Sequence, residues 1–110
     1  MKLEKAVASF AALAHETRLG AFRRLVGAGP EGASASALAE ALGVGPTALS
    51  FHLSQLSAAG LVQSRREGRW TYYSADFVRM RALIDYLLED CCRGALAADV
   101  QRAAKTRKGC

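Results

Sequence analysis

Residues 37–60 read ALAEALGVGPTALSFHLSQLSAAG, and this stretch decides the fold of the chain. Residues 37–42 are predicted to form a short helix, with either Ser34 or Ser36 as its N-cap. The Gly-Val-Gly sequence at residues 43–45 breaks that helix. Because a second helical segment follows at once, the two helices and the turn between them are predicted to form a helix-turn-helix.

The second helix is predicted over residues 46–59. It begins at Pro46, a favoured first-turn residue, and stops before Gly60, the residue type expected just past a helix C-terminus. At about 100° per residue, one face is apolar and carries Leu49, Leu53 and Leu56. The opposite face and its flanks carry Thr47, Ser50, Phe51, Ser54 and Gln55. Hydroxyl, amide and ring groups of this kind can contact base edges in a DNA major groove.

The segments on both sides of the helix-turn-helix have clear periodicities. Upstream, apolar residues at helical spacing predict helices at about residues 3–14 and 18–27. Downstream, residues 61–67 and 69–74 are two segments with β propensity on either side of Gly68, which predicts a hairpin with its turn at Gly68. The tip of this hairpin is predicted to gather Arg65, Arg66 and Arg69. Their guanidinium groups could bind DNA phosphates or enter a minor groove.

A long amphipathic helix is predicted after the hairpin. Asp76 can cap it, and the helix is expected to run to Cys91 and Cys92 before a break at Gly94. The complete order of elements predicts a mainly α fold with a β-hairpin wing, the winged helix-turn-helix. We therefore expect a DNA-binding and dimerisation domain over residues 1–94. Residues 95–110 are a basic C-terminal tail that carries the third cysteine.

The composition excludes several classes of protein. The chain has 110 residues and a net charge of +5, so it is the size of one domain and suits a polyanionic partner such as double-stranded DNA. The N-terminal residues lack the apolar core of a signal peptide, and no apolar stretch is long enough to span a bilayer, which predicts a cytoplasmic protein. Neither a nucleophile with a paired base nor a glycine-rich phosphate loop is present, so no enzyme is expected.

Four segments carry a resemblance to a known family. They are residues 10–19 (FAALAHETRL), 39–43 (AEALG), 49–56 (LSFHLSQL) and 58–62 (AAGLV). Together they resemble the arsenic-repressor (ArsR/SmtB-type) family of metal-sensing winged helix repressors, over about residues 5–92. The resemblance implies a homodimer that is formed by the first and last helices and binds an inverted repeat in operator DNA. It also implies that an effector weakens DNA binding.

The resembling region contains one departure from the family and one residue with two candidate roles. Glu16 and Thr17 stand where the family often has a proline, a departure that concerns only the start of a helix. His52 lies about 60° from the centre of the core-facing stripe, and the resemblance implies a partly structural role for it. His52 is therefore a candidate both for a core contact and for a DNA contact.

The effector site is predicted from the ligands that the chain contains. Members of the family hold ligands at different points, but residues 33–45 lack cysteine, and His15 and His52 are not on the last helix. The remaining ligands are Cys91, Cys92 and Cys110. Three thiolates suit trivalent arsenic better than tetrahedral zinc. A branch of the family resembles this chain in its Cys-Cys pair and downstream cysteine, which implies arsenite as the effector, with antimonite or a methylated arsenical as alternatives.

The sequence leaves alternatives for the source of the third thiolate and for the class of effector. A continuous helix would carry Cys110 about 27 Å from Cys92, so the tail must fold back or the third thiolate must come from the other subunit. A repressor of the same fold that responds to redox state or persulfide is one alternative. A DNA-binding or protein-interaction module without a sensing function is another.

Overall fold

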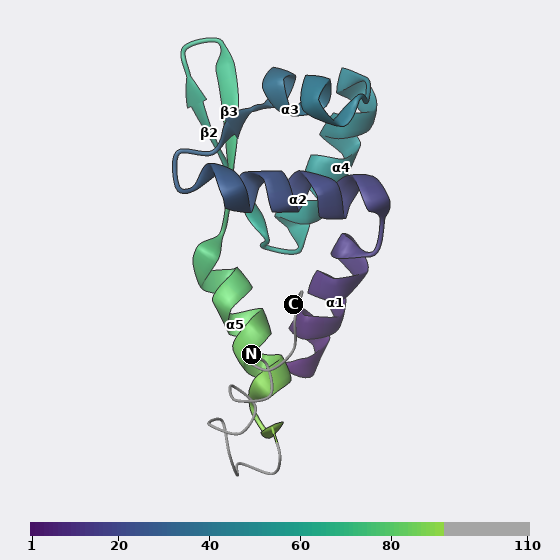
Figure 1. Ribbon diagram of the computed structural model, residues 1–110, viewed down its shortest axis with the longest axis vertical. Coiled ribbons are helices and arrows are strands. Elements are labelled where there is room, and N and C mark those ends of the chain that lie inside the picture. Colours follow the sequence, from purple (N-terminus) through teal and green to yellow (C-terminus); the bar gives the residue numbers. More distant parts are fainter. Residues whose placement is uncertain (92–110) are drawn as a thin grey trace, which may run out of the picture.

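The computed structural model describes residues 1–91, which form five α-helices and a three-stranded antiparallel sheet (Figure 1). In chain order the elements are α1 (Leu3–Leu13), α2 (Glu16–Ala28), β1 (Ala33–Ser34), α3 (Ala35–Leu42), α4 (Pro46–Ala58), β2 (Val62–Glu67), β3 (Trp70–Ala75) and α5 (Phe77–Leu88). This order confirms the predicted winged helix-turn-helix, in which the β2–β3 hairpin is the wing. None of these helices combines the length and hydropathy that a bilayer-spanning segment requires.

The turn between α3 and α4 has the local features that the sequence predicts. The Ser34 hydroxyl accepts a hydrogen bond from the Ala37 N–H at 3.2 Å, so Ser34, and not Ser36, is the N-cap. Gly43 adopts a left-handed conformation with φ 67°, and its N–H donates a hydrogen bond to carbonyl oxygens in the last turn of α3. Because that conformation favours glycine, the helix ends there. Pro46 then begins α4.

The core lies where α4 packs against the other elements. Leu49, Leu53 and Leu56 are all buried, which confirms the apolar face predicted for α4. Their neighbours in the buried cluster include Leu25 of α2 and Leu61, which follows α4. Burying such leucines is the dominant stabilising contribution in a domain of this size, at about 1.5–3 kcal/mol for each side chain. The core therefore fixes the orientation of α4 about its own axis.

Strand β1 is not predicted from the sequence. It contains only two residues, which pair with the middle of β3 in the registers Ala33↔Tyr73 and Ser34↔Tyr72. The sheet order is therefore β1-β3-β2, with β3 in the centre. Gly32 precedes β1 with φ +73°, and a Cβ built there would lie 1.9 Å from the Tyr73 carbonyl oxygen. Only glycine permits this close approach, which holds the start of α3 against the wing.

The buried face of α1 differs from the apolar residues at helical spacing that predict this helix, namely Leu3, Val7, Phe10, Ala11 and Ala14. Ala6, Ser9 and Ala12 are buried, and the Ser9 hydroxyl donates a 2.9 Å hydrogen bond to the Lys5 carbonyl. The larger side chains of this helix, Leu3, Val7 and Phe10, are exposed. Small inward residues let α1 pack closely against α2 and α4. The larger apolar side chains are left on the outer surface of α1.

Helix α5 is shorter than predicted. It ends at Leu88 and does not extend through Cys91, so that part of the prediction is wrong. The next two residues are Glu89 and Asp90, and carboxylates are unfavourable at the negative end of a helix dipole. The predicted break at Gly94, the domain boundary after residue 94 and the tail lie outside the described residues.

Candidate nucleic-acid interface

The outward face of α4 carries the polar residues predicted for base contacts. All five predicted side chains are exposed: Thr47, Ser50, Phe51, Ser54 and Gln55. Phe51 has 57% of its surface exposed, so its ring is available for an apolar contact with a ligand. The Ser54 hydroxyl donates a 2.7 Å hydrogen bond to the Phe51 carbonyl, so its oxygen is left to accept from a ligand. This face therefore offers hydroxyl, amide and ring groups from one rigid helix.

The three predicted arginines of the wing differ in their surroundings. Arg65 and Arg66 lie along β2, opposite Tyr72 and Thr71, whereas Arg69 lies in the turn between the strands. The prediction that all three gather at the tip is therefore correct only for Arg69. The Nε atom of Arg65 lies 3.0 Å from a carboxylate oxygen of Glu67, and its guanidinium lies 5.0 Å from the centre of the Tyr72 ring.

Arg66 and Arg69 are the arginines of the wing best suited to a polyanion. Within residues 1–91, neither side chain has an ion pair with a carboxylate. Both are exposed. A guanidinium that is not neutralised by a neighbour can release a counterion from DNA when it contacts a phosphate. The charge of Arg65 is already partly balanced by Glu67, so a phosphate contact of Arg65 would release less counterion.

His52 lies on the inner flank of α4 and contacts the start of α2. Its ring centre lies 4.5 Å from that of His15 and 5.7 Å from that of Phe51. The His52 Nδ1 atom is buried and has no hydrogen-bond partner in the described part of the chain. Burial lowers the pKa of His52 from its ordinary value of 6.5, and the nearby His15 and Arg18 lower that pKa further. The neutral imidazole therefore packs between α2 and α4.

His15 explains how α2 starts without the proline that the resemblance leads one to expect. Its backbone is extended, and its Nδ1 accepts a hydrogen bond from the Thr17 N–H at 3.1 Å. This is an N-cap interaction, and α2 accordingly begins at Glu16. The acidic Glu16 in the first turn also suits the positive end of the helix dipole.

We expect acid to destabilise the fold through His52. Because its pKa is lower in the folded state, the unfolded chain binds more protons below pH 6.5. The contribution of a neutral His52 to the free energy of unfolding is therefore fully present above pH 6.5. It decreases as the pH falls toward the lowered pKa that His52 has in the folded protein. The His52→Gln variant should show a flatter pH dependence of the urea unfolding midpoint below pH 6.5. Equal slopes for the two proteins would contradict this assignment.

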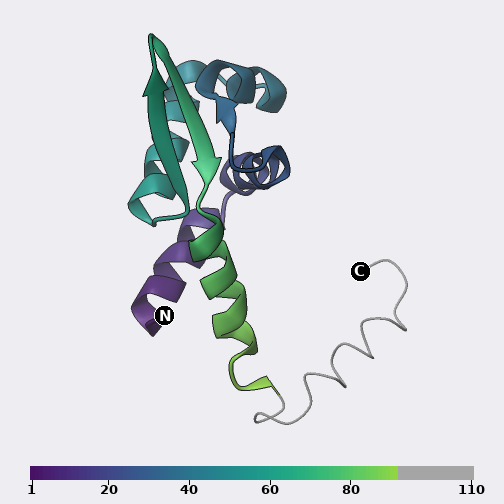
Figure 2. The ribbon, with the colours of Figure 1, turned by 90° about the vertical axis from the view of Figure 1, so that its left-hand side faces the viewer.

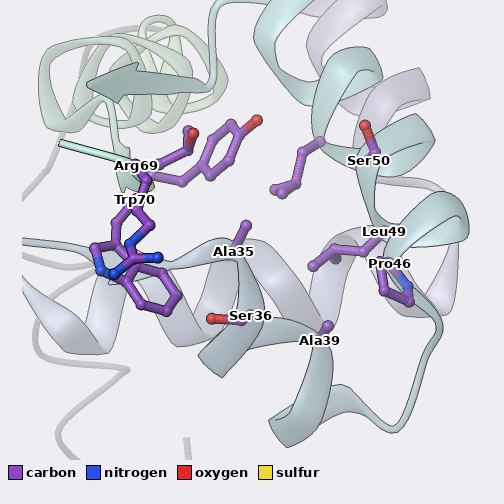
Figure 3. Close-up of a pocket in the computed structure, with 11 residues that line it drawn as sticks. Ala35, Ser36, Ala39, Pro46, Leu49, Ser50, Arg69 and Trp70 are labelled. Carbon is purple, nitrogen blue, oxygen red and sulfur yellow. The ribbon is translucent and has the colours of Figure 1, made fainter. Parts of the chain in front are cut away.

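A cavity of about 390 Å³ opens between α3, α4 and the start of β3. Figure 3 shows Arg69 and Trp70 on one side of it, and Leu49, Pro46 and Ser50 on the other. Trp70 has 53% of its surface exposed, and the sequence analysis did not identify it as a site residue. The signal that could have found it is a tryptophan that directly follows an arginine at a hairpin turn.

The described part of the predicted cysteine site is Cys91. This residue is half-buried and lies three positions beyond the end of α5, while Cys92 and Cys110 lie outside the described residues. Within residues 1–91, no three or more His, Cys, Asp and Glu side chains form a cluster that could hold a metal ion. A cavity of about 330 Å³ lies beside Cys91 and is lined also by Tyr86, Leu87, Glu89 and Asp90.

Comparisons with known proteins find one matching family and several similar chains. Residues 13–65 match a family described as a helix-turn-helix domain. A Halobacterium salinarum protein that carries the name arsenical resistance operon repressor ArsR is 42% identical over 71 residues, which are 64% of this chain and 54% of that protein. The chain spans about half the length of the curated relatives it matches.

Solved structures extend the similarity over most of the chain. An ArsR-like transcriptional regulator from Rhodococcus sp. RHA1 is 32% identical, with a TM-score of 0.67, and the match covers 93% of this chain and 88% of that one. A homodimeric winged helix-turn-helix DNA-binding domain from Mycobacterium bovis is 31% identical, with a TM-score of 0.63. That match covers 80% of this chain and 82% of the Mycobacterium bovis domain.

Proposed function

Because this chain belongs to the ArsR family of winged helix-turn-helix transcriptional regulators, we propose that it is a homodimeric repressor of operator DNA that trivalent arsenic releases. The family and the fold are those of DNA-binding regulators and not of enzymes. The proposal adds three parts to this assignment: the residues that contact DNA, the helices that form the dimer, and the cysteines that bind the effector.

One observation carries the DNA-binding part of the proposal. The polar side chains of α4 and the arginines of the wing are exposed, and Ser50 of α4 and Arg69 of the wing line the same groove. The wing lies at the end of the molecule away from α1 and α5 (Figure 1). In this proposal α4 is the recognition helix in the major groove, where Thr47, Ser50, Phe51, Ser54 and Gln55 meet base edges. Arg65, Arg66 and Arg69 contact the phosphates or the minor groove. His52 supports α4 from behind.

The dimer is proposed to form through α1 and α5. These two helices lie side by side and project away from the wing, as Figures 1 and 2 show. Both expose large apolar side chains, namely Leu3, Val7 and Phe10 of α1 and Ile84, Leu87 and Leu88 of α5. Exposed apolar surface of this kind is typical of a protein interface. A twofold axis through this surface would place two recognition helices on one face of the DNA.

The effector is proposed to bind Cys91, Cys92 and Cys110. Trivalent arsenic would supply up to three bonds to thiolate sulfur, and three thiolates without a histidine are the ligand set that it suits. The name of the Halobacterium relative supports a metalloid as the effector. The position of Cys91 beside Tyr86 and Leu87 supports an effect on α5 when a ligand binds there. Antimonite or a methylated arsenical is proposed as an alternative ligand of the same thiols.

The DNA-binding residues are tested by comparing two kinds of variant on an operator selected from a random DNA pool. Arg66→Ala should weaken binding to selected and random DNA alike, and should reduce the slope of log K against log salt by about 0.9. Gln55→Ala should instead reduce the preference for the selected sequence, by about 1–3 kcal/mol. Fluorescence anisotropy of labelled DNA at several salt concentrations measures both effects.

Arg24→Ala is the matched control for Arg66→Ala. Arg24 is exposed on α2 and has no ion pair within residues 1–91, so its removal takes the same charge from a helix outside both the proposed DNA interface and the proposed dimer interface. We expect this variant to bind both DNAs almost as the wild type does. If Arg66→Ala and Gln55→Ala lost the same amount of sequence preference, the division between phosphate and base contacts would be wrong.

A further inference from the structure

The cavity between α4 and the wing has the properties of a small-molecule site. Its volume of about 390 Å³ falls within the range of about 300–1,000 Å³ that is common for ligand pockets. Much of its wall is apolar and includes Ala39, Leu49 and Leu53, which are buried. Figure 3 shows that Ala35, Ser36 and Ala39 of α3 line it between the wing residues and α4. Three separate elements therefore line one groove that is open to solvent on one side.

The walls of this cavity are fixed relative to one another. The pairing of Ala33 with Tyr73 joins the start of α3 to β3, and Tyr73 itself lines the cavity. The hydrogen bond from the Ala37 N–H to Ser34 fixes the first turn of α3. Leu49 and Leu53 hold α4 in the core. A preformed cavity of this kind binds a ligand without first paying the entropy of ordering its walls.

The chemistry of the lining selects one class of ligand. Arg69 is the charged residue among the lining side chains, and within residues 1–91 it has no ion pair. Beside it, Trp70 presents a large exposed ring. No carboxylate, thiol or imidazole lines the cavity, so a cation or a metal ion would find no ligand there. A negative group on Arg69 and a flat apolar body against Trp70 would complement the lining.

We propose that this cavity binds a small aromatic carboxylate and that the bound carboxylate competes with DNA. The competition rests on the proposed function, because Arg69 and Ser50 belong both to the cavity and to the proposed DNA interface. A phosphate group of the DNA backbone could also meet Arg69, but it has no apolar body to contact the rest of the lining. The aromatic part therefore distinguishes the proposed ligand from a DNA phosphate, because only the ligand can contact the apolar lining.

Mass action gives the size of the expected effect. If the carboxylate binds only the protein that is free of DNA, its presence at ten times its Kd raises the apparent Kd for the operator about elevenfold. This route of release does not involve Cys91, Cys92 or Cys110. The serine variants of these cysteines should therefore respond to the carboxylate as the wild type does.

Trp70 provides a direct test of binding because it is the sole tryptophan of the chain. We would titrate the full-length protein without DNA and follow Trp70 fluorescence with three probes: phenylacetate, its uncharged amide phenylacetamide, and inorganic phosphate. The proposal expects a saturable change with phenylacetate and at least tenfold weaker binding of phenylacetamide. Phosphate at equal concentration should produce little change. A change of equal size with phosphate would identify a backbone-phosphate contact and overturn the proposal.

Variants separate the site from general charge effects. Arg69→Gln should weaken phenylacetate binding at least tenfold without altering the weak binding of phenylacetamide, and Arg69→Lys should restore part of the loss. Arg81→Gln removes the same charge from α5 and should leave both titrations unchanged. A wild-type response in Arg69→Gln, or no saturable response in the wild type, would overturn the proposed site.

The competition is measured separately by anisotropy of labelled operator. Release of the operator by phenylacetate, with a midpoint that tracks the fluorescence Kd, supports the complete proposal. Phenylacetate binding without release would overturn the competition. Failure of the protein to bind any operator would instead contradict the proposed function, while the fluorescence titration would still decide whether the cavity binds the carboxylate.

Discussion

Leu87→Glu is expected to convert the protein from a dimer to a monomer and to weaken operator binding by about 10²- to 10⁴-fold. Leu87 has 63% of its surface exposed in the single chain, so a carboxylate there remains solvated while the protomer is folded. In the proposed dimer the same carboxylate would lose its hydrating water against the apolar surface of the partner, which is strongly unfavourable. Each recognition helix would then bind its half-site independently, so the gain in affinity from linking two binding sites would be lost.

The structure also shows which residue of α5 can test dimerisation without disturbing the fold of the protomer. Leu83 and Leu87 both belong to the apolar face of the amphipathic helix that the sequence predicts after Asp76, so the sequence does not distinguish between them. Leu83, however, is only 6% exposed and belongs to the core of the protomer, so a charged residue there would unfold the chain. The loss of dimerisation in a Leu83 variant would therefore not report on the interface.

Val78→Glu is the matched control for Leu87→Glu. Val78 is 82% exposed, and at about 100° per residue it lies on the opposite side of α5 from Leu87. It adds the same charge to the same helix, and we expect it to remain dimeric. Sedimentation equilibrium at micromolar concentration distinguishes the two variants. A dimeric Leu87→Glu variant, or a monomeric wild type, would show that α5 does not form the interface.

Cys91→Ser and Cys92→Ser are each expected to abolish release of the operator by arsenite while leaving the affinity of the ligand-free protein unchanged. The structure changes the physical argument for this expectation, because α5 ends at Leu88 and does not carry Cys91. We propose that the coupling instead acts through the cavity beside Cys91. This cavity is lined also by Tyr86, Leu87, Glu89 and Asp90, and Leu87 is the proposed interface residue. A ligand there can favour a different dimer geometry by about 1–3 kcal/mol.

Cys110→Ser tests whether Cys110 supplies the third thiolate. It should weaken the response to arsenite but spare the response to a monosubstituted arsenical, since that ligand needs only two thiols. The midpoint of operator release, followed by anisotropy under reducing conditions, measures all three variants. If Cys91→Ser and Cys92→Ser released DNA with wild-type midpoints, the effector would bind elsewhere. If release required an oxidant or a persulfide and not arsenite, the redox alternative would be correct.

The sequence by itself determined the parts of this protein that depend on local signals. The leucine spacing of α4 specifies which face is buried, and the same spacing leaves Thr47, Phe51 and Gln55 on the surface. The Gly43 turn and the Gly68 hairpin are local as well, because each glycine adopts a positive φ that other residues avoid. These signals are sufficient to predict the helix-turn-helix and the wing, since every interaction involved lies within a few residues of the chain.

Only the tertiary structure decided the features that depend on a distant partner. The inward face of α1 is set by close packing against α2 and α4, which selects Ala6 and Ala12 over the larger Leu3 and Val7. The pairing of Ala33 with Tyr73 brings together residues forty positions apart, and a two-residue strand has no periodicity of its own to predict it. That pairing places α3 beside Trp70 and creates the cavity between the wing and α4. Contacts of this kind form only when the whole chain has folded, so no local pattern encodes them.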